Sequence, residues 1–302
     1  MSRFVNVATV LFSTCAERGK KDAKDILLRE TKAVLESMKG YGFDLVVFSE
    51  GVEAFGQTVD EAEELKNPGP FLKMYMEFAA SEKCHVAGSI KIAENGKAHN
   101  SIAFIDAEGK ALGAYHKNNL TAGEIEMGLN SGGKAVTVDT AIGRIGGIIC
   151  FDLNFEDIRK QYMKLKPDIM AFASMYHGGL MQAQWAYQCR SFFVSALPFT
   201  GGGILDPFGR ALALTDCYTS IASARINLDR VMVHLDYNRE KFPEIRRKYK
   251  GDVIVDIPPN IGPALIYSMT DKRSAMDVVR EFGLELMDDY MERSITANKN
   301  NR

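Results

Sequence analysis

Segments with the residue pattern of β-strands alternate with helical segments along the first part of this chain. Phe4–Phe12 and Leu45–Phe48 are apolar and are predicted as strands, whereas Lys21–Met38 and Pro70–Glu82 have the apolar spacing of helices. Three more strands are predicted, separated by turn signals such as Asn95-Gly96: residues 84–93, 101–106 and 111–115. This alternation is typical of an α/β fold with mixed sheets.

The strand pattern over residues 143–149 ends at a cysteine, Cys150, which is followed by residues that can start a helix. Asp152 or Asn154 is predicted to cap the helix over residues 155–165. A cysteine at a strand end that faces a helix N-terminus is favoured as thiolate, the nucleophilic form. The alternative interpretation is that Cys150 is a small buried hydrophobic residue.

Two other strand patterns also end in ionisable residues, at Glu50 and at Lys117. Because the carboxyl ends of parallel strands line the ligand crevice of an α/β sheet, these side chains and Cys150 could meet there. Glu50 would then act as a base for the thiol, and Lys117 would stabilise the developing oxyanion. Taken singly, Glu50 or Lys117 is more readily interpreted as a solvated charge at a strand end than as a catalytic residue.

At these residues the chain resembles the carbon-nitrogen hydrolase family, or nitrilase superfamily, over roughly residues 3 to 230. The similar motifs are Leu45–Glu50, Tyr115–Leu120, and the set Gly132, Gly143, Gly146, Cys150, Asp152, Phe155 and Arg159. The chain departs from the family in two places. Ser49 stands where most members have proline, and Ser191–Val194 replaces the common Ala-x-Glu-Asn.

The resemblance implies an α/β four-layer α-β-β-α sandwich of the nitrilase type, with Glu50, Lys117 and Cys150 as the catalytic triad. It also implies cleavage of an amide or N-carbamoyl C–N bond of a small molecule through a thioester on Cys150, releasing ammonia or an amine and a carboxylic acid. Nitrile hydrolysis, acyl transfer and a non-catalytic binding role remain alternatives. A homodimer or higher homo-oligomer is expected from the resemblance alone.

Residues outside the triad are candidates for a supporting role. The family often has a second glutamate in the loop after the lysine, for which Glu124 is the first choice and Glu126 the second. Tyr176 and His177 follow another predicted strand and could bind substrate. The alternative interpretations are a solvated carboxylate, an exposed histidine and an aromatic core residue.

The charge balance and the cysteine pattern exclude several classes of partner. With 37 basic and 39 acidic residues the net charge is −2, so neither nucleic acid nor an anionic membrane surface is an expected partner. The 5 cysteines have no metal-ligand spacing, so we expect no metal and no cofactor. The first residues lack the pattern of a signal peptide, and no apolar run reaches the roughly 20 residues of a membrane span. These features predict a cytoplasmic protein.

The resemblance fades beyond about residue 230, which indicates a different C-terminal part. We predict a carbon-nitrogen hydrolase domain over residues 1–257 and a C-terminal extension over residues 258–302. Pro258-Pro259 separates the two, and an amphipathic helix is predicted over Ser274–Met291.

Overall fold

A computed structural model describes residues 3–302, whose contacts group the chain into two compact units. The larger unit is Val5–Arg225, and the smaller consists of Ile226–Arg302 with the start of the chain. The domain boundary predicted after residue 257 falls within the smaller unit. The extent of the functional domain therefore stays a prediction.

The first of two six-stranded sheets has the strand order β12-β1-β2-β3-β4-β5. Its strands are β1 (Phe4–Val10), β2 (Leu45–Val47), β3 (His85–Glu94), β4 (Lys97–Ile105), β5 (Ala111–His116) and β12 (Ile221–Asn227). Strands β1, β2 and β3 are parallel, whereas β3, β4 and β5 pair in antiparallel fashion, so the sheet is mixed as predicted. The β3–β4 turn is formed by Asn95 and Gly96, which both have positive φ.

The second sheet has the order β11-β10-β9-β8-β7-β6. Its strands are β6 (Thr137–Thr140), β7 (Gly143–Ile149), β8 (Ile169–Ala173), β9 (Phe192–Ala196), β10 (Gly203–Leu205) and β11 (Ala211–Leu214). Strands β7, β8 and β9 are parallel and occupy the middle of the sheet. Strand β2, which leads to Glu50, and strand β7, which leads to Cys150, therefore each have a neighbouring strand on both sides.

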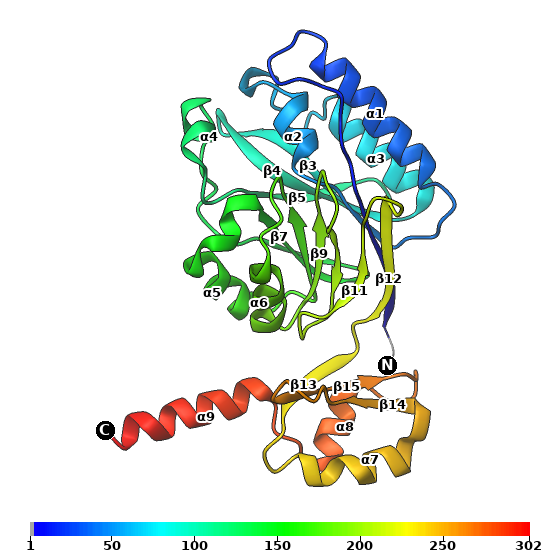
Figure 1. Ribbon diagram of the computed structural model, residues 1–302, viewed down its shortest axis with the longest axis vertical. Helices are drawn as coiled ribbons and strands as arrows, with labels where there is room; N and C mark the ends of the chain where they lie inside the picture. The colour runs from blue at the N-terminus through cyan, green and yellow to red at the C-terminus, as the bar shows by residue number, and fades with distance from the viewer. Residues whose placement is uncertain (1–2) are drawn as a thin grey trace. The chain divides into compact units, whose positions relative to one another are not determined.

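Helices cover the outer face of each sheet, which gives four layers in the larger unit (Figure 1). Helices α1 (Ala23–Ser37) and α3 (Pro70–Glu82) lie on the first sheet, and α5 (Glu156–Leu165) and α6 (Leu180–Cys189) lie on the second. The short elements α2 (Gly51–Gly56), η1 (Val59–Glu61), α4 (Ala122–Glu126) and η2 (Cys150–Asn154) stand between strands. The predicted α-β-β-α sandwich is confirmed.

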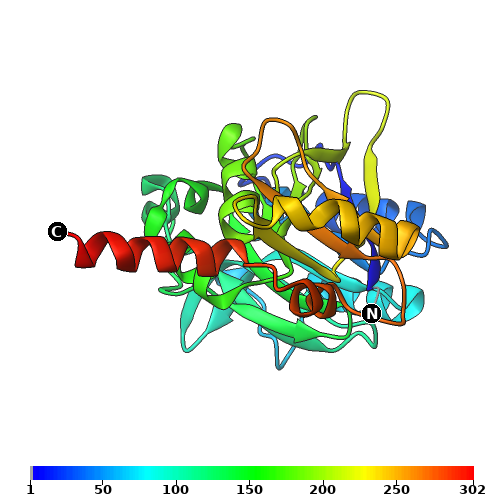
Figure 2. The same cartoon turned by 90° about the horizontal axis from the view of Figure 1, so that it is seen from below.

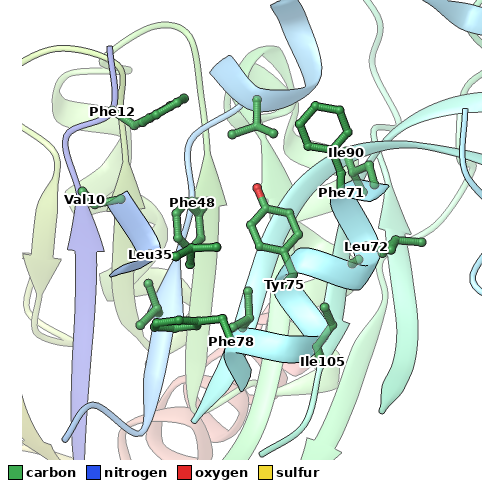
Figure 3. Close-up of a cluster of buried hydrophobic side chains, with 14 of the residues drawn as sticks. Val10, Phe12, Leu35, Phe48, Phe71, Leu72, Tyr75, Phe78, Ile90 and Ile105 are labelled. Atoms are coloured by element: carbon green, nitrogen blue, oxygen red, sulfur yellow. The ribbon is translucent and has the colours of Figure 1, made fainter. Parts of the chain in front are cut away.

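A core of apolar side chains joins α1 and α3 to the first sheet (Figure 3). Leu35 of α1 and Phe78 of α3 pack in the same cluster as Phe48, which follows β2. Tyr75 is fully buried there, with its ring 5.2 Å from that of Phe48. Complete burial of each such large side chain contributes about 1.5–3 kcal/mol to the free energy of folding. This cluster therefore fixes the position of the segment that leads into Glu50.

The two sheets pack closely against each other at Gly147 of β7. A Cβ atom at this position would lie 2.8 Å from Cβ of Tyr115 and 2.9 Å from Cζ of Phe104. We expect Gly147→Ala to lower the free energy of unfolding by about 1–3 kcal/mol, because overpacking forces backbone shifts. Gly251→Ala, where a Cβ meets nothing within 4 Å, is the control. Equal denaturation midpoints for both variants would contradict this view of the interface between the sheets.

The smaller unit is built on a three-stranded antiparallel sheet of order β13-β15-β14. Its elements are β13 (Arg230–His234), η3 (Arg239–Lys241), α7 (Phe242–Tyr249), η4 (Lys250–Asp252), β14 (Val253–Asp256), β15 (Pro263–Ser268), α8 (Ala275–Phe282) and α9 (Met287–Asn300). A core that includes Phe242, Ile245 and Val278 joins α7 and α8 to the sheet.

The single helix predicted over Ser274–Met291 is wrong, because the structure has two helices there. Helix α8 ends at Gly283, which is in the left-handed conformation, with φ +56°, that glycine adopts without strain. Helix α9 starts after Leu286, whose backbone is extended. Helix α9 extends away from the sheet of its own unit, and Met287 is its buried residue (Figure 2).

Candidate active site

Glu50 lies where strand β2 gives way to helix α2, in the larger unit. It is 3% exposed, and its carboxylate has a hydrogen-bond partner on each oxygen. Oε1 accepts from Lys117 Nζ at 2.9 Å, and Oε2 accepts from the backbone N–H of Met175 at 2.9 Å. Contacts from two different strand ends therefore fix the orientation of this carboxylate.

Lys117 follows strand β5 and is 1% exposed. Its Nζ donates to Glu50 and also to both oxygens of Glu124, at 2.8 and 2.9 Å. The structure thus brings Glu124 to the lysine, while Glu126, the second choice, is exposed. Glu124 is held in turn by helix α4, where it forms a capping box with Thr121.

Asn100 of strand β4 links the two glutamates that flank Lys117. Its Nδ2 donates to Oε1 of Glu50 and to Oε1 of Glu124, each at 2.8 Å. The ammonium group and the amide therefore satisfy both carboxylates in a site where an unpaired charge would be too costly. This bridging role depends on the antiparallel pairing of β4 with β5, which brings Asn100 beside the segment that carries Lys117.

Cys150 ends strand β7 and begins the short helix η2, with a backbone φ of +47°. This left-handed conformation is uncommon for a non-glycine residue and turns the chain sharply at the strand end. The side chain is half-buried. It lines the same pocket as Glu50 and Lys117, so all three predicted triad residues border one cavity.

The prediction that Asp152 or Asn154 caps the following helix is wrong. Helix α5 starts after Phe155, which provides no side-chain cap. Asp152 is instead fully buried, where it accepts from the hydroxyl of Tyr115 at 2.6 Å and from the backbone N–H of Asn119 at 2.7 Å. It thereby ties the segment after Cys150 to the segment around Lys117.

The electrostatics of the site favour a neutral thiol beside a charged lysine. Burial raises the pKa of Cys150 to about 12, with a further contribution from the Glu50 carboxylate that exceeds the opposing effect of Lys117. This contradicts the expectation that the helix N-terminus would favour thiolate. For Lys117 burial acts to lower the pKa, but the nearby negative groups, Glu50 first, outweigh it and raise the pKa. A nucleophilic role for Cys150 would therefore require a base that removes the thiol proton.

The pocket around Cys150 has a volume of about 180 Å³. Its lining consists of Arg18, Glu50, Glu53, Ala54, Lys91, Lys117, Thr121, Gly123, Glu124, Met127, Cys150 and Met175. Tyr176 and His177 follow Met175 but are not among these residues. Tyr176 accepts a hydrogen bond from Asn154, and His177 is exposed. Their role in substrate binding stays a prediction.

Glu53 and Lys91 are pocket residues that sequence reasoning missed. Each side chain is 5% exposed, and Lys91 Nζ lies 2.6 Å from Glu53 Oε1. Glu53 stands one helical turn after Glu50, which was a signal available in the sequence. Lys91 could not be found in that way, because only the pairing of the first sheet brings β3 beside α2.

Within residues 3–302 no group of His, Cys, Asp or Glu side chains is arranged to hold a metal ion. In the same range no helix combines the length and apolar character needed to cross a membrane.

The carbon-nitrogen hydrolase family matches residues 14–231, so the chain belongs to this family. A hydrolase of Schizosaccharomyces pombe, C26A3.11, is 25% identical over 239 residues, which are 68% of this chain and 73% of that protein. The deaminated glutathione amidase of Dictyostelium discoideum is 26% identical over 66% of this chain and 78% of its own length. Among solved structures, Nit3 of Saccharomyces cerevisiae superposes with a TM-score of 0.64 at 19% identity, covering 82% of this chain and 95% of Nit3. The structural similarity to Nit3 supports the assignment of the fold alone.

Proposed function

We propose that this protein is a thiol hydrolase that cleaves a non-peptide C–N bond of a small molecule. The bond is an amide or N-carbamoyl bond, and the reaction passes through a thioester on Cys150. The observation that carries the proposal is the buried Glu50–Lys117 ion pair, with 2.9 Å between Oε1 and Nζ, in the wall of the pocket that Cys150 also lines. The names of amidase relatives support the same reaction class.

In the first half-reaction the Cys150 thiol attacks the carbonyl carbon of the substrate. Glu50 takes the thiol proton as the S–C bond forms, which is required because the thiol has a raised pKa. The oxyanion is stabilised by Lys117 and by the backbone N–H after Cys150. When the C–N bond breaks, Glu50 gives its proton to the leaving nitrogen, and ammonia or an amine departs.

In the second half-reaction water attacks the thioester. Glu50 takes a proton from the water, and the S–C bond breaks with return of a proton to sulfur and release of a carboxylic acid. Lys117 stays protonated throughout, because its raised pKa makes it a poor proton donor. Glu124 and Asn100 hold Lys117 and Glu50 in place between the two steps.

Nitrile hydrolysis or acyl transfer would use the same three side chains, and a protein that only binds ligands would keep the pocket. The test is a panel of primary amides, N-carbamoyl amino acids and nitriles, read by ammonia release and by the carboxylic acid formed. We expect primary amides or N-carbamoyl compounds to be turned over at measurable rates. Turnover of nitriles alone, or of no member of the panel, would contradict the proposal. A cytoplasmic location and a homo-oligomeric state are proposed with it.

A further inference from the structure

The wall of the Cys150 pocket holds a second buried ion pair that the proposed mechanism does not use. Glu53 belongs to helix α2 and Lys91 to strand β3, and both side chains are 5% exposed. Lys91 Nζ also donates to the backbone carbonyl of Glu53 at 2.8 Å. A buried ion pair is weak evidence of stabilisation, because well-packed apolar residues in its place are often as stable. Its position in the pocket wall points to a role in binding.

The Glu53 carboxylate has unused capacity to accept hydrogen bonds. Among residues 3–302, no donor makes a directed hydrogen bond to Oε1 of Glu53, although this atom is fully buried. This oxygen is in close contact with the Lys91 ammonium group, whose Nζ lies 2.6 Å away, and a carboxylate oxygen accepts more than one donor. A buried carboxylate in this state is stabilised by a ligand that supplies N–H donors.

The buried part of the pocket also carries an excess of negative charge. The carboxylates of Glu50, Glu53 and Glu124 face two ammonium groups, those of Lys91 and Lys117. Burial raises the pKa of Glu53, Lys91 opposes this, and Glu50 adds to the rise. A positively charged group near Glu53 would offset the excess, whereas an anion in the same place would increase it.

The third cation of the lining, Arg18, is exposed. Its Nε donates to the carbonyl of Ala54 at 3.0 Å, and it borders both the Cys150 pocket and a neighbouring cavity of about 710 Å³. A substrate carboxylate would be favoured beside the exposed Arg18, whereas a substrate ammonium group would be favoured beside Glu53, so the two locations predict opposite substrate preferences.

We propose that Glu53 determines substrate specificity by accepting hydrogen bonds from a protonated amine on the acyl part of the amide. The preferred substrate class is then an amino-substituted carboxamide, whose ammonium group lies against Glu53 while its carbonyl carbon lies at Cys150. This inference rests on the proposed function for the reaction. The preference for binding an ammonium group can be measured separately from turnover.

The test uses carboxamides that differ only in the terminal group. β-Alaninamide, butanamide and succinamate carry an ammonium, a methyl and a carboxylate group on the same chain, and γ-aminobutyramide, pentanamide and glutaramate form the next longer set. We expect kcat/KM to follow the order ammonium, methyl, carboxylate, with about 10- to 100-fold between the first two, the usual range for a hydrogen bond to a charged group. A methyl or carboxylate compound equal to or better than the ammonium compound in both sets would overturn the proposal.

The matched variant is Glu53→Gln, which keeps the shape of the side chain and removes its charge. It should lower kcat/KM for the ammonium compound about 10-fold or more and change the value for the methyl compound by less than about threefold. The effect should lie mainly in KM. Glu77→Gln, which removes an exposed carboxylate on α3, is the control. An equal loss for all three compounds would show that Glu53 only positions the site, and would contradict a binding role.

A binding measurement separates this inference from the proposed reaction. Each amide is tested for protection of Cys150 against alkylation by iodoacetamide in the full chain, which needs no turnover. Protection in the order ammonium, methyl, carboxylate supports the inference even if no amide is hydrolysed, and any other order overturns it. If Glu53→Gln does not fold, the double variant Glu53→Gln with Lys91→Gln is used, because it removes both buried charges. The order in which the three amides protect Cys150 in the wild-type protein decides the outcome in either case.

Discussion

Replacing Cys150 with alanine is expected to lower the rate of amide hydrolysis by about four orders of magnitude or more, because no thioester can form. The substitution removes one sulfur from a half-buried position, so the fold should be retained. The measurement is kcat/KM for the best amide of the substrate panel, combined with the midpoint of thermal unfolding. Loss of activity with an unchanged midpoint is the expected result.

The control for this variant is Cys217→Ala, which removes an exposed cysteine from the turn between β11 and β12. Its rate should stay within about twofold of the wild-type value, as for most surface substitutions. If the Cys150 variant kept a substantial fraction of the wild-type rate, Cys150 could not be the nucleophile. Glu50 would then have to act directly on water, and the mechanism proposed above would be wrong.

Replacing Lys117 with methionine is expected to lower the free energy of unfolding by about 3–5 kcal/mol and to abolish turnover. Methionine fits the volume of the side chain but leaves Glu50 and Glu124 as neighbouring buried carboxylates without their shared cation. Removing one partner from a buried ion pair costs this much because the remaining charge stays desolvated. The measurement is equilibrium unfolding in urea at neutral pH.

Two further variants test whether the loss of stability in Lys117→Met comes from the buried ion pairs. Lys160→Met removes an exposed lysine whose i,i+4 ion pair with Glu156 is solvated, so its cost should be below about 1 kcal/mol. Adding Glu50→Gln and Glu124→Gln to Lys117→Met should recover part of the lost stability, because no buried charge is then left unpaired. A Lys117→Met protein as stable as the wild type would contradict the ion-pair network.

The positions of Glu50, Lys117 and Cys150 at strand ends were accessible from the sequence. Each follows an apolar run short enough to be a buried strand. Their meeting place was not accessible, because Glu50 and Lys117 follow strands of the first sheet whereas Cys150 follows β7 of the second. The order of strands was not accessible, since β1, β2 and β3 are joined by long connections that contain helices. The four-layer arrangement was predicted from the family resemblance and not from periodicity.

What sequence reasoning missed depends on contacts between segments distant in the chain. Asp152 has the residue type of a helix cap, but the Tyr115 hydroxyl at 2.6 Å provides a competing partner that local rules cannot see. The raised pKa of Cys150 arises from burial and from Glu50, so it could not be deduced from the strand end alone. Lys91 lies in a strand with no local signal of function, and only the fold places it against Glu53.

The most direct test of the mechanism is the mass of the protein during turnover. Rapid acid quenching of the full chain with the best amide, followed by peptide mass mapping, should find the acyl group of that substrate on the peptide that contains Cys150, and none on the other 4 cysteines. Turnover without any acyl adduct on Cys150, or with the adduct on another residue, would contradict the thioester mechanism.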